Sequence, residues 1–152
     1  MNTLNDQEAT SIMTYDEEMI ARTAIQHLQA IYNNAGDRGK VDDMLTAFAS
    51  DGVLDIESET FAGHEAIKGF IGKIASGQSP THLVGARHHL TTSRFEIDGE
   101  DKARAWTYFF VMRRCEFLHE GTYVDHYARI DGRWLITHRR FKIVHDAEIT
   151  AG

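Results

Sequence analysis

The stretch of residues 85–99 carries the side chains best suited to moving protons. It begins with an Arg87-His88-His89 cluster, reads as a strand, and closes on Asp98-Gly99, a dipeptide typical of hairpin turns. Imidazole has an ordinary pKa of about 6.5, so it takes and gives protons near neutral pH. Side chains alternate between the two faces of a strand, so only one of these two histidines can face an interior pocket.

The sequence does not indicate metal or nucleotide chemistry. The other histidines are scattered, without the His-x-x-x-His spacing of a metal site. The single cysteine, Cys115, excludes an internal disulfide and has no second thiol with which to bind a metal. The chain contains no phosphate-binding loop, no nucleotide-binding glycine fingerprint and no serine elbow. We therefore expect a site that uses neither a metal nor a cofactor.

Helices are expected to position this strand. The pattern Thr14-Tyr-Asp-Glu17 is a capping box, which predicts a helix start. The apolar positions that follow recur at helical spacing, and Gly36 is expected to end or kink this helix, with Asp37 immediately beyond it. The residues of this apolar stripe are Ala21, Ala24, Ile25, Leu28, Ile31, Tyr32 and Ala35.

The region between residues 41 and 83 predicts shorter elements. We expect a second helix over 41–49, a turn at Asp51-Gly52 and a short strand over 53–56 that pairs with 60–62. A third helix is expected over 64–74, and a loop around Pro80 is expected to form the rim of a pocket.

From residue 87 onward the sequence predicts four strands, over 87–97, 102–114, 117–130 and 133–144. Asp98-Gly99 and Asp131-Gly132 are typical hairpin turns, and residues 116–121 are expected to make the remaining reversal. Helices followed by an antiparallel meander indicate an α+β fold with the helices on one face of the sheet. Trp106, Tyr108 and Phe110 alternate along one strand, so we expect them in the core or in an aromatic cavity wall.

Length and charge limit the possible functions. The 152 residues suit one domain, which we place at 15–146 behind an N-terminal arm of 1–14. A net charge of -7 argues against a nucleic acid or an anionic membrane surface as partner. No signal-type N-terminus and no run of 18 apolar residues is present, so we expect a cytoplasmic protein.

The order of several short motifs resembles that of a known family. The motifs are the helix ending near Gly36-Asp37, Phe48-Ala-Ser-Asp-Gly52, Phe61-Ala-Gly-His-Glu-Ala-Ile67, Arg87-His88, residues 121–129, Asp131-Gly-Arg-Trp134 and His138-Arg139. In this order the chain, over roughly residues 15–145, resembles the SnoaL-like family of the nuclear transport factor two superfold. The resemblance implies a cone, in which a curved antiparallel sheet wraps around a long helix and encloses an apolar cavity.

Two branches of the superfold match at individual positions. Bile-acid and scytalone-type dehydratases and hexachlorocyclohexane dehydrochlorinase use an Asp-His pair, and the matching positions are Asp37 and His88. The bile-acid branch has a tyrosine that matches Tyr32, and the dehydrochlorinase has an arginine that matches Arg139. The resemblance thus implies that His88 is the base, that Asp37 orients it, and that Tyr32 and Arg139 polarise an oxygen or a leaving group.

Each of these residues also has a structural interpretation. His88 can be a hydrogen-bonded structural histidine, Asp37 a helix cap, Tyr32 part of the core, and Arg139 the partner of a carboxylate. Asp125 is a further candidate, because ketosteroid isomerases of this superfold keep a similar aspartate protonated. The isomerase base falls on an isoleucine here, so we expect Asp125 to orient Arg139 or a substrate hydroxyl, or to form a salt bridge.

These expectations lead to three hypotheses about function. The first is a cofactor-free dehydratase, other lyase, isomerase or cyclase that acts on a small hydrophobic cyclic substrate and forms a homodimer or higher homo-oligomer. The second is a SnoaL-like module that binds a small molecule without catalysis. The third is the small subunit of a ring-hydroxylating oxygenase. The superfold supports all three, so the site rather than the fold must decide among them.

Overall fold

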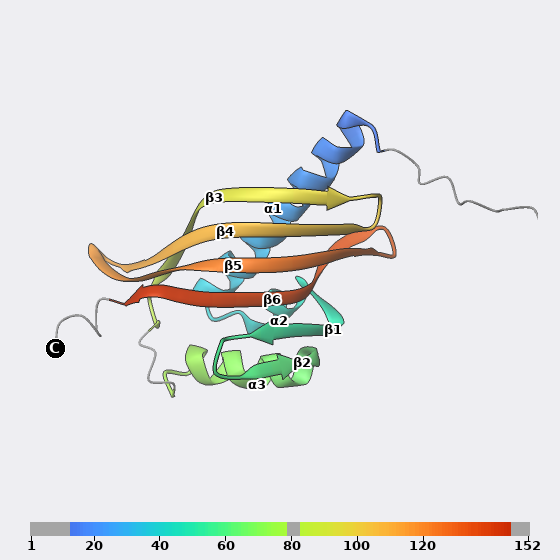
Figure 1. The fold of residues 1–152 in the computed structure, drawn as a ribbon. Coiled ribbons are helices and arrows are strands. Elements are labelled where there is room, and N and C mark those ends of the chain that lie inside the picture. Colours follow the sequence, from blue (N-terminus) through green and yellow to red (C-terminus); the bar gives the residue numbers. More distant parts are fainter. Residues whose placement is uncertain (1–12, 79–82, 147–152) are drawn as a thin grey trace, which may run out of the picture.

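The computed structural model describes residues 13–78 and 83–146 (Figure 1). It contains a long helix and a six-stranded sheet. The first half contains α1 (Tyr15–Asp37), α2 (Val41–Leu45), β1 (Phe48–Asp55), β2 (Thr60–Ala62) and α3 (Gly63–Ala75). The second half contains β3 (Arg87–Asp98), β4 (Lys102–Arg113), β5 (Glu116–Ile130) and β6 (Arg133–Asp146). Most of the predicted N-terminal arm, residues 1–12, lies outside the described residues.

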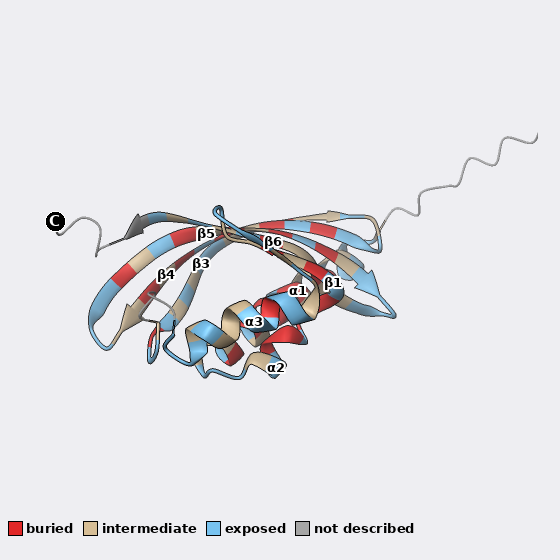
Figure 2. Ribbon diagram, turned by 90° about the horizontal axis from the view of Figure 1, so that it is seen from below, coloured by how far each residue is buried: buried red, intermediate tan, exposed pale blue. Residues whose placement is uncertain are grey.

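The strands lie in the order β2-β1-β6-β5-β4-β3, and the sheet does not close into a barrel. The meander from β3 to β6 is antiparallel, as predicted, whereas β1 pairs with β6 in parallel. Figure 2 shows the sheet curving over the helices, which lie on its concave side. The predicted α+β cone is confirmed. None of the described helices is both long and apolar enough to cross a membrane.

The apolar stripe of α1 packs against the concave face of the sheet. The predicted capping box is present: the Glu17 backbone N–H donates to Thr14 Oγ1, and the Thr14 backbone N–H donates to the Glu17 carboxylate. Ile25, Leu28 and Tyr32 are buried on this face, as predicted. The same face also buries two polar side chains, those of Gln29 and Asn33, which the apolar pattern did not predict.

The end of α1 lies beyond Gly36, contrary to prediction. The helix continues through Asp37, and Gly39 then adopts a left-handed conformation with φ +67°. Glycine takes this conformation without steric cost, and the Lys40 N–H reaches back 2.9 Å to the Ala35 carbonyl to close the last turn. Asp37 therefore projects from a hydrogen-bonded helical turn rather than from a loop.

The prediction of a helix over 41–49 was wrong in its second half, because Phe48 starts a strand. The backbone of residues 48–55 pairs with β6, and this tertiary pairing outweighs the local helical spacing. Gly52 is needed at the bulge between the paired positions Phe48 and Val53. A Cβ at Gly52 would lie 2.9 Å from the Ala49 carbonyl oxygen and 3.0 Å from the Ile136 carbonyl oxygen.

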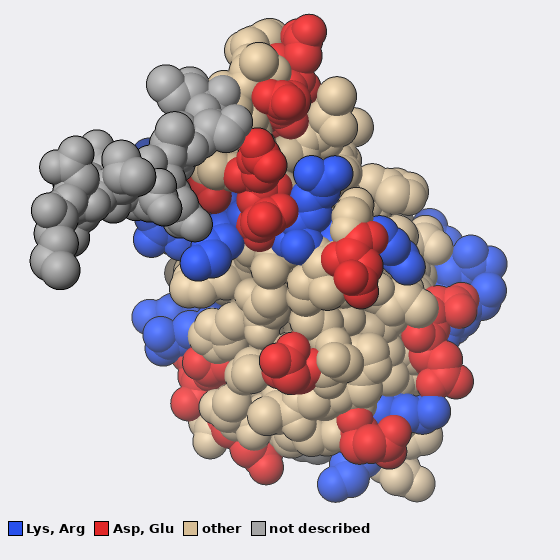
Figure 3. Space-filling view, turned by 90° about the vertical axis from the view of Figure 1, so that its right-hand side faces the viewer, with Lys and Arg blue, Asp and Glu red and all other residues tan. Residues whose placement is uncertain are grey.

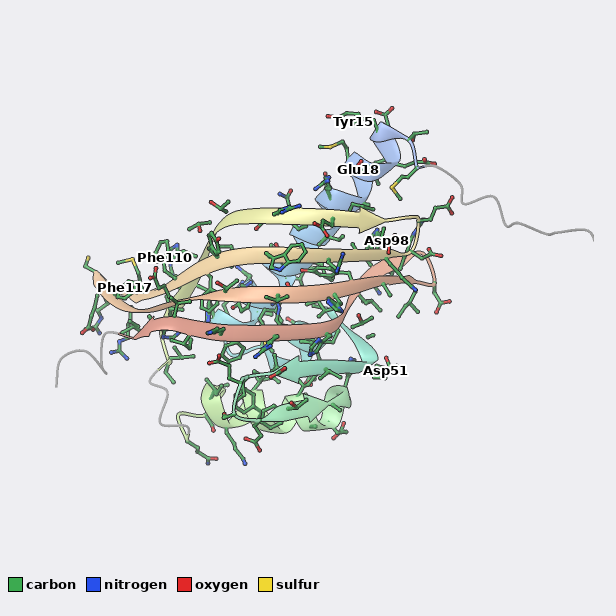
Figure 4. All side chains as sticks on the ribbon, viewed as in Figure 1. Tyr15, Glu18, Asp51, Asp98, Phe110 and Phe117 are labelled. Carbon is green, nitrogen blue, oxygen red and sulfur yellow. The ribbon has the colours of Figure 1, made fainter. Side chains whose placement is uncertain are left out.

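Two further expectations about β4 and β5 were wrong. Residues 116–121 do not form the reversal, because β5 begins at Glu116 and the turn lies at Arg114, where φ is +59°. Tyr108 lies on the outer face with 58% of its surface exposed, and Phe109 is the strand's inward-facing aromatic residue. Trp106 and Phe110 share the face of Tyr108 by alternation. Figure 4 places Phe110 and Phe117 at the end of the sheet opposite Asp98.

Candidate active site

A cavity of about 290 Å³ lies between the helices and the concave face of the sheet. Its apolar wall includes side chains from α2, α3 and β6, among them Met44, Phe70, Ile71, Phe141 and Ile143. Its polar lining residues include Tyr32, Asn33 and Asp37 of α1, Arg38 at the end of that helix, His88 of β3, and His119 and Tyr123 of β5. Apolar walls with a few convergent polar groups are typical of small-molecule sites.

The side chains of Asp37 and His88 meet at the wall of this cavity. Asp37 Oδ1 lies 2.6 Å from His88 Nδ1, and Oδ2 accepts a hydrogen bond of 3.0 Å from the His88 backbone N–H. A carboxylate only accepts hydrogen bonds, so the proton of the neutral imidazole sits on Nδ1 and the lone pair on Nε2. The two side chains are 14% and 21% exposed, respectively.

The position of Asp37 is electrostatically unfavourable for the helix. The C-terminal end of a helix carries partial negative charge, and a carboxylate there typically costs about 0.3–1 kcal/mol. Asp37 is the last residue of α1, and the last turn contains no basic residue. The double hydrogen bond to His88 offsets this cost. A residue that breaks a local rule while completing a polar cluster is typical of a functional site.

Two tyrosines line the cavity next to the Asp37-His88 pair. Burial raises the pKa of Tyr32, against the opposing effect of the Arg139 charge, so its hydroxyl stays protonated. Burial also raises the pKa of Tyr123 well above its ordinary value, and the Tyr123 hydroxyl donates to Asn33 Oδ1 at 3.2 Å. Both tyrosines are therefore neutral near pH 7, and both line the cavity.

Arg139 and Asp125 lie behind the cavity wall rather than on it. Both are fully buried, and neither belongs to the residues that line the cavity. The guanidinium carbon of Arg139 lies 4.1 Å from the ring centres of both Tyr32 and Tyr123. Burial opposes the charge of Arg139, but the adjacent Asp125 carboxylate more than compensates and holds the pKa of Arg139 well above its ordinary value.

A buried polar cluster extends from this ion pair to α1. The Tyr127 hydroxyl donates to Asp125 Oδ2 at 2.6 Å and accepts from the Gln29 amide at 3.0 Å. Gln29 also donates to Thr107 at 3.0 Å. This cluster explains why a polar residue lies on the apolar face of α1, and it fixes the helix that carries Tyr32 and Asp37.

The sequence interpretation missed three residues that shape the cavity. Phe109 stacks on Tyr123 with 4.3 Å between ring centres, and its ring lies over Gly121. A Cβ at Gly121 would lie only 2.7 Å from Phe109 Cζ, so glycine is required there by close approach. His119 lines the cavity from β5. Its alternation with Gly121 and Tyr123 on one strand face was the signal that identifies it.

The described residues contain no group of three or more His, Cys, Asp or Glu side chains arranged to hold a metal ion. Figure 3 shows acidic and basic side chains interspersed over the face that it presents.

Comparison with known proteins identifies the family. The model of the SnoaL-like domain matches residues 17–140, which cover most of the chain. The chain belongs to the SnoaL-like family. None of the curated proteins matches it.

Several solved structures share this fold. A hexachlorocyclohexane dehydrochlorinase of LinA type 3 from Novosphingobium barchaimii is 16% identical, with a TM-score of 0.75 over 88% of this chain and 93% of that one. A protein from Novosphingobium aromaticivorans assigned as a scytalone dehydratase is 19% identical, with a TM-score of 0.74 over 87% and 89% of the two chains. An NTF2-like protein with a cystatin-like fold from the same species is 20% identical, with a TM-score of 0.71 over 88% and 89%. At these identities the likeness establishes the fold of this SnoaL-like chain, and its chemistry must be argued from its own residues.

Proposed function

We propose that this SnoaL-like protein is an acid–base enzyme of the lyase or isomerase type, with His88 as its base. The observation that carries the proposal is the 2.6 Å contact between Asp37 Oδ1 and His88 Nδ1 at the wall of an apolar cavity. The contact leaves the lone pair on Nε2, the nitrogen suited to removing a proton from a substrate carbon.

The reaction begins with a carbon-bound proton next to a carbonyl group. His88 Nε2 takes this proton, and the pair of electrons left on carbon moves toward the carbonyl oxygen. Asp37 stabilises the imidazolium that forms and keeps the ring oriented. The Tyr32 hydroxyl donates a hydrogen bond to the oxygen that gains charge. A leaving group on the next carbon then departs, or the proton returns to a different carbon; the first outcome is elimination and the second is isomerisation.

Arg139 has a supporting role in this proposal. Its guanidinium is enclosed by Asp125 and by the rings of Tyr32 and Tyr123, so it acts on the substrate through Tyr32 rather than by direct contact. Its positive charge opposes the rise in the pKa of Tyr32 that burial causes, and thereby makes this hydroxyl a stronger donor.

The substrate class follows from the size and lining of the cavity. A volume of about 290 Å³ is near the lower end of the range for ligand pockets, about 300–1,000 Å³. The aromatic rings of Phe109, Phe70 and Phe141 suit a flat, apolar skeleton. We therefore propose a small cyclic ketone, such as a hydroxysteroid fragment or a cyclic polyketide.

The test uses proton exchange, because exchange requires the base but no particular leaving group. The protein is incubated in deuterium oxide with a panel of cyclic ketones, and deuterium incorporation next to the carbonyl is measured by mass spectrometry. His88→Gln is expected to reduce the exchange rate about 10²- to 10⁴-fold, which is the typical contribution of a general base.

His89→Gln is a matched control, since His89 is the neighbouring residue on the same strand. Its ring stacks on Phe110 with 4.9 Å between ring centres, and it is absent from the cavity lining. Exchange is expected to persist in this variant. Equal rates in the His88→Gln variant and the unmodified protein would reject the proposal. Ligand binding without any exchange would favour a binding module instead.

A further inference from the structure

The cavity contains a second imidazole, that of His119, which faces the same space as His88. His119 lies on β5, and His88 lies near the start of β3, so β4 separates them. Both residues line the cavity. The inference below depends on the proposed function, because it assigns the second half of the reaction that His88 begins.

Strand register places the two histidines on one line across the sheet. Val111 of β4 is paired with His88 on one side and with His119 on the other. Paired residues in an antiparallel sheet point to the same face, so all three side chains point into the cone. Neighbouring strands lie roughly 4.8 Å apart, so about 10 Å separates the two histidine backbones.

The space between the two imidazoles is shaped by a short residue and an aromatic ring. Val111 lies between the two histidines in the sheet, is fully buried and does not belong to the residues that line the cavity. The Phe109 ring centre lies 5.9 Å from that of His88 and 6.2 Å from that of His119, with the second contact edge to face. A ligand in the cavity that contacts Phe109 would therefore lie near both imidazoles.

We propose that His119 is the acid that protonates a leaving oxygen while His88 removes the carbon-bound proton. The C–H bond breaks, its proton passes to His88 Nε2, and its electrons form the new double bond. The C–O bond on the next carbon breaks, and the oxygen takes a proton from the His119 imidazolium and leaves as water. One proton is taken up and one is given, so the charge of the two imidazoles together is unchanged.

This assignment narrows the substrate class to a β-hydroxy carbonyl compound on a cyclic skeleton. Hydroxide is a poor leaving group and needs a proton as the C–O bond breaks, whereas chloride departs without one. A site with two imidazoles is therefore suited to dehydration, and a site with one suffices for loss of chloride.

The experiment compares two substrates that share one cyclic ketone skeleton, with a hydroxyl or a chlorine on the β-carbon. His119→Gln is expected to lower kcat/KM for loss of water about 10²- to 10⁴-fold. Loss of chloride and deuterium exchange next to the carbonyl are expected to change little, because both need only His88. His119→Ala with added imidazole gives a second measurement, in which loss of water is expected to recover.

Each outcome of this experiment decides the inference. Equal effects of His119→Gln on both substrates, or no effect on either, would overturn the role of His119 and leave His88 as the base. Unchanged exchange in His88→Gln, or no exchange by the unmodified protein on any ketone tested, would overturn the proposed function together with this inference. His126→Gln is the matched control, because His126 is an exposed residue of the same strand and does not line the cavity, and it is expected to retain both reactions.

Discussion

Asp125 holds Arg139 with two hydrogen bonds, of 2.8 Å from Nε to Oδ1 and 2.7 Å from Nη2 to Oδ2. The residues are directly paired across β5 and β6, and both side chains have no exposed surface. The third guanidinium nitrogen, Nη1, has no hydrogen-bond partner among the described residues, and the rings of Tyr32 and Tyr123 flank the group instead. The two cavity tyrosines thus pack against a buried ion pair.

Loss of the Asp125–Arg139 pair is expected to destabilise the fold strongly. Asp125→Ala leaves a buried arginine without its counter-charge, and breaking a buried pair from one side typically costs about 3–5 kcal/mol. Urea denaturation measures the free energy of unfolding. Asp42→Ala is the control, because it removes an exposed 2.7 Å contact with Lys68, and exposed ion pairs contribute little to stability. Similar decreases in the free energy of unfolding of the two variants would show that the buried pair stabilises the fold no more than the exposed pair does.

Asp37→Asn is expected to separate activity from stability. An amide can still accept from the His88 backbone N–H, but it cannot stabilise an imidazolium by charge, so proton exchange should fall by about 10²-fold or more. Stability should change little, because the carboxylate is unfavourable at the end of α1 and its removal offsets part of the lost hydrogen bonding. Thermal unfolding and deuterium exchange are measured on the same sample. A variant that unfolds but stays active when folded would contradict this expectation.

Gly121→Ala is expected to deform the cavity wall. The added Cβ would lie 2.3 Å from the Lys142 carbonyl oxygen and 2.7 Å from Phe109 Cζ, so the Phe109 ring and β6 must both move. We expect a loss of about 1–3 kcal/mol in the free energy of unfolding, together with weaker ligand binding. Gly69→Ala in α3 is the control. No atom lies within 4 Å of its added Cβ, and alanine favours a helix by up to about 1 kcal/mol. Unaltered stability of Gly121→Ala would contradict this prediction, because it would mean that β6 and the Phe109 ring make room for the added Cβ without cost.

The stability of the fold is expected to fall in mild acid, in part through His126. Burial, the neighbouring His138 and Arg104 lower the pKa of His126 from its ordinary 6.5, although Asp125 acts in the opposite direction. The unfolded chain therefore binds a proton at a higher pH than the folded chain does. The contribution of His126 to stability is complete above pH 6.5 and is lost as the pH falls below it.

Urea denaturation above and below pH 6.5 measures this loss, and His126→Gln should reduce it. His27→Gln on an exposed position of α1 is a suitable control. A larger loss of stability on acidification in His126→Gln than in the unmodified protein would contradict this prediction.

Local patterns predicted the elements that carry their own signals. The capping box at Thr14 and Glu17, the stripe of α1 and the turns at Asp98-Gly99 and Asp131-Gly132 depend on residues close in sequence, and all four are present. The strand at Phe48 was missed because its reason lies about ninety residues away, in β6. Alternating aromatic residues show that Trp106, Tyr108 and Phe110 share one face of the strand, but they do not show whether that face packs against the helices. Tyr108 was therefore expected inside, and it lies outside.

The candidate site, like the fold, could be predicted from the sequence only in part. The contact between Asp37 and His88 follows from family resemblance, and the structure places the two side chains together, while their roles stay predictions. The pairing of Arg139 with Asp125 confirms an alternative that the sequence left open. The two tyrosine rings that flank Arg139 come from different elements, so no local pattern predicted their positions. His119 was overlooked because it was grouped with the scattered histidines that lack metal-ligand spacing, although it belongs to the strand predicted over 117–130.

The central place of β6 has a consequence for synthesis of the chain. The β1–β2 hairpin and the β3–β5 meander have no strand pairing with each other, and the final strand joins them. The two sheet segments therefore cannot unite before β6 has left the ribosome. Nascent chains that stop at residue 132 should remain sensitive to proteases, and the sheet should assemble only once residues 133–146 are available for pairing.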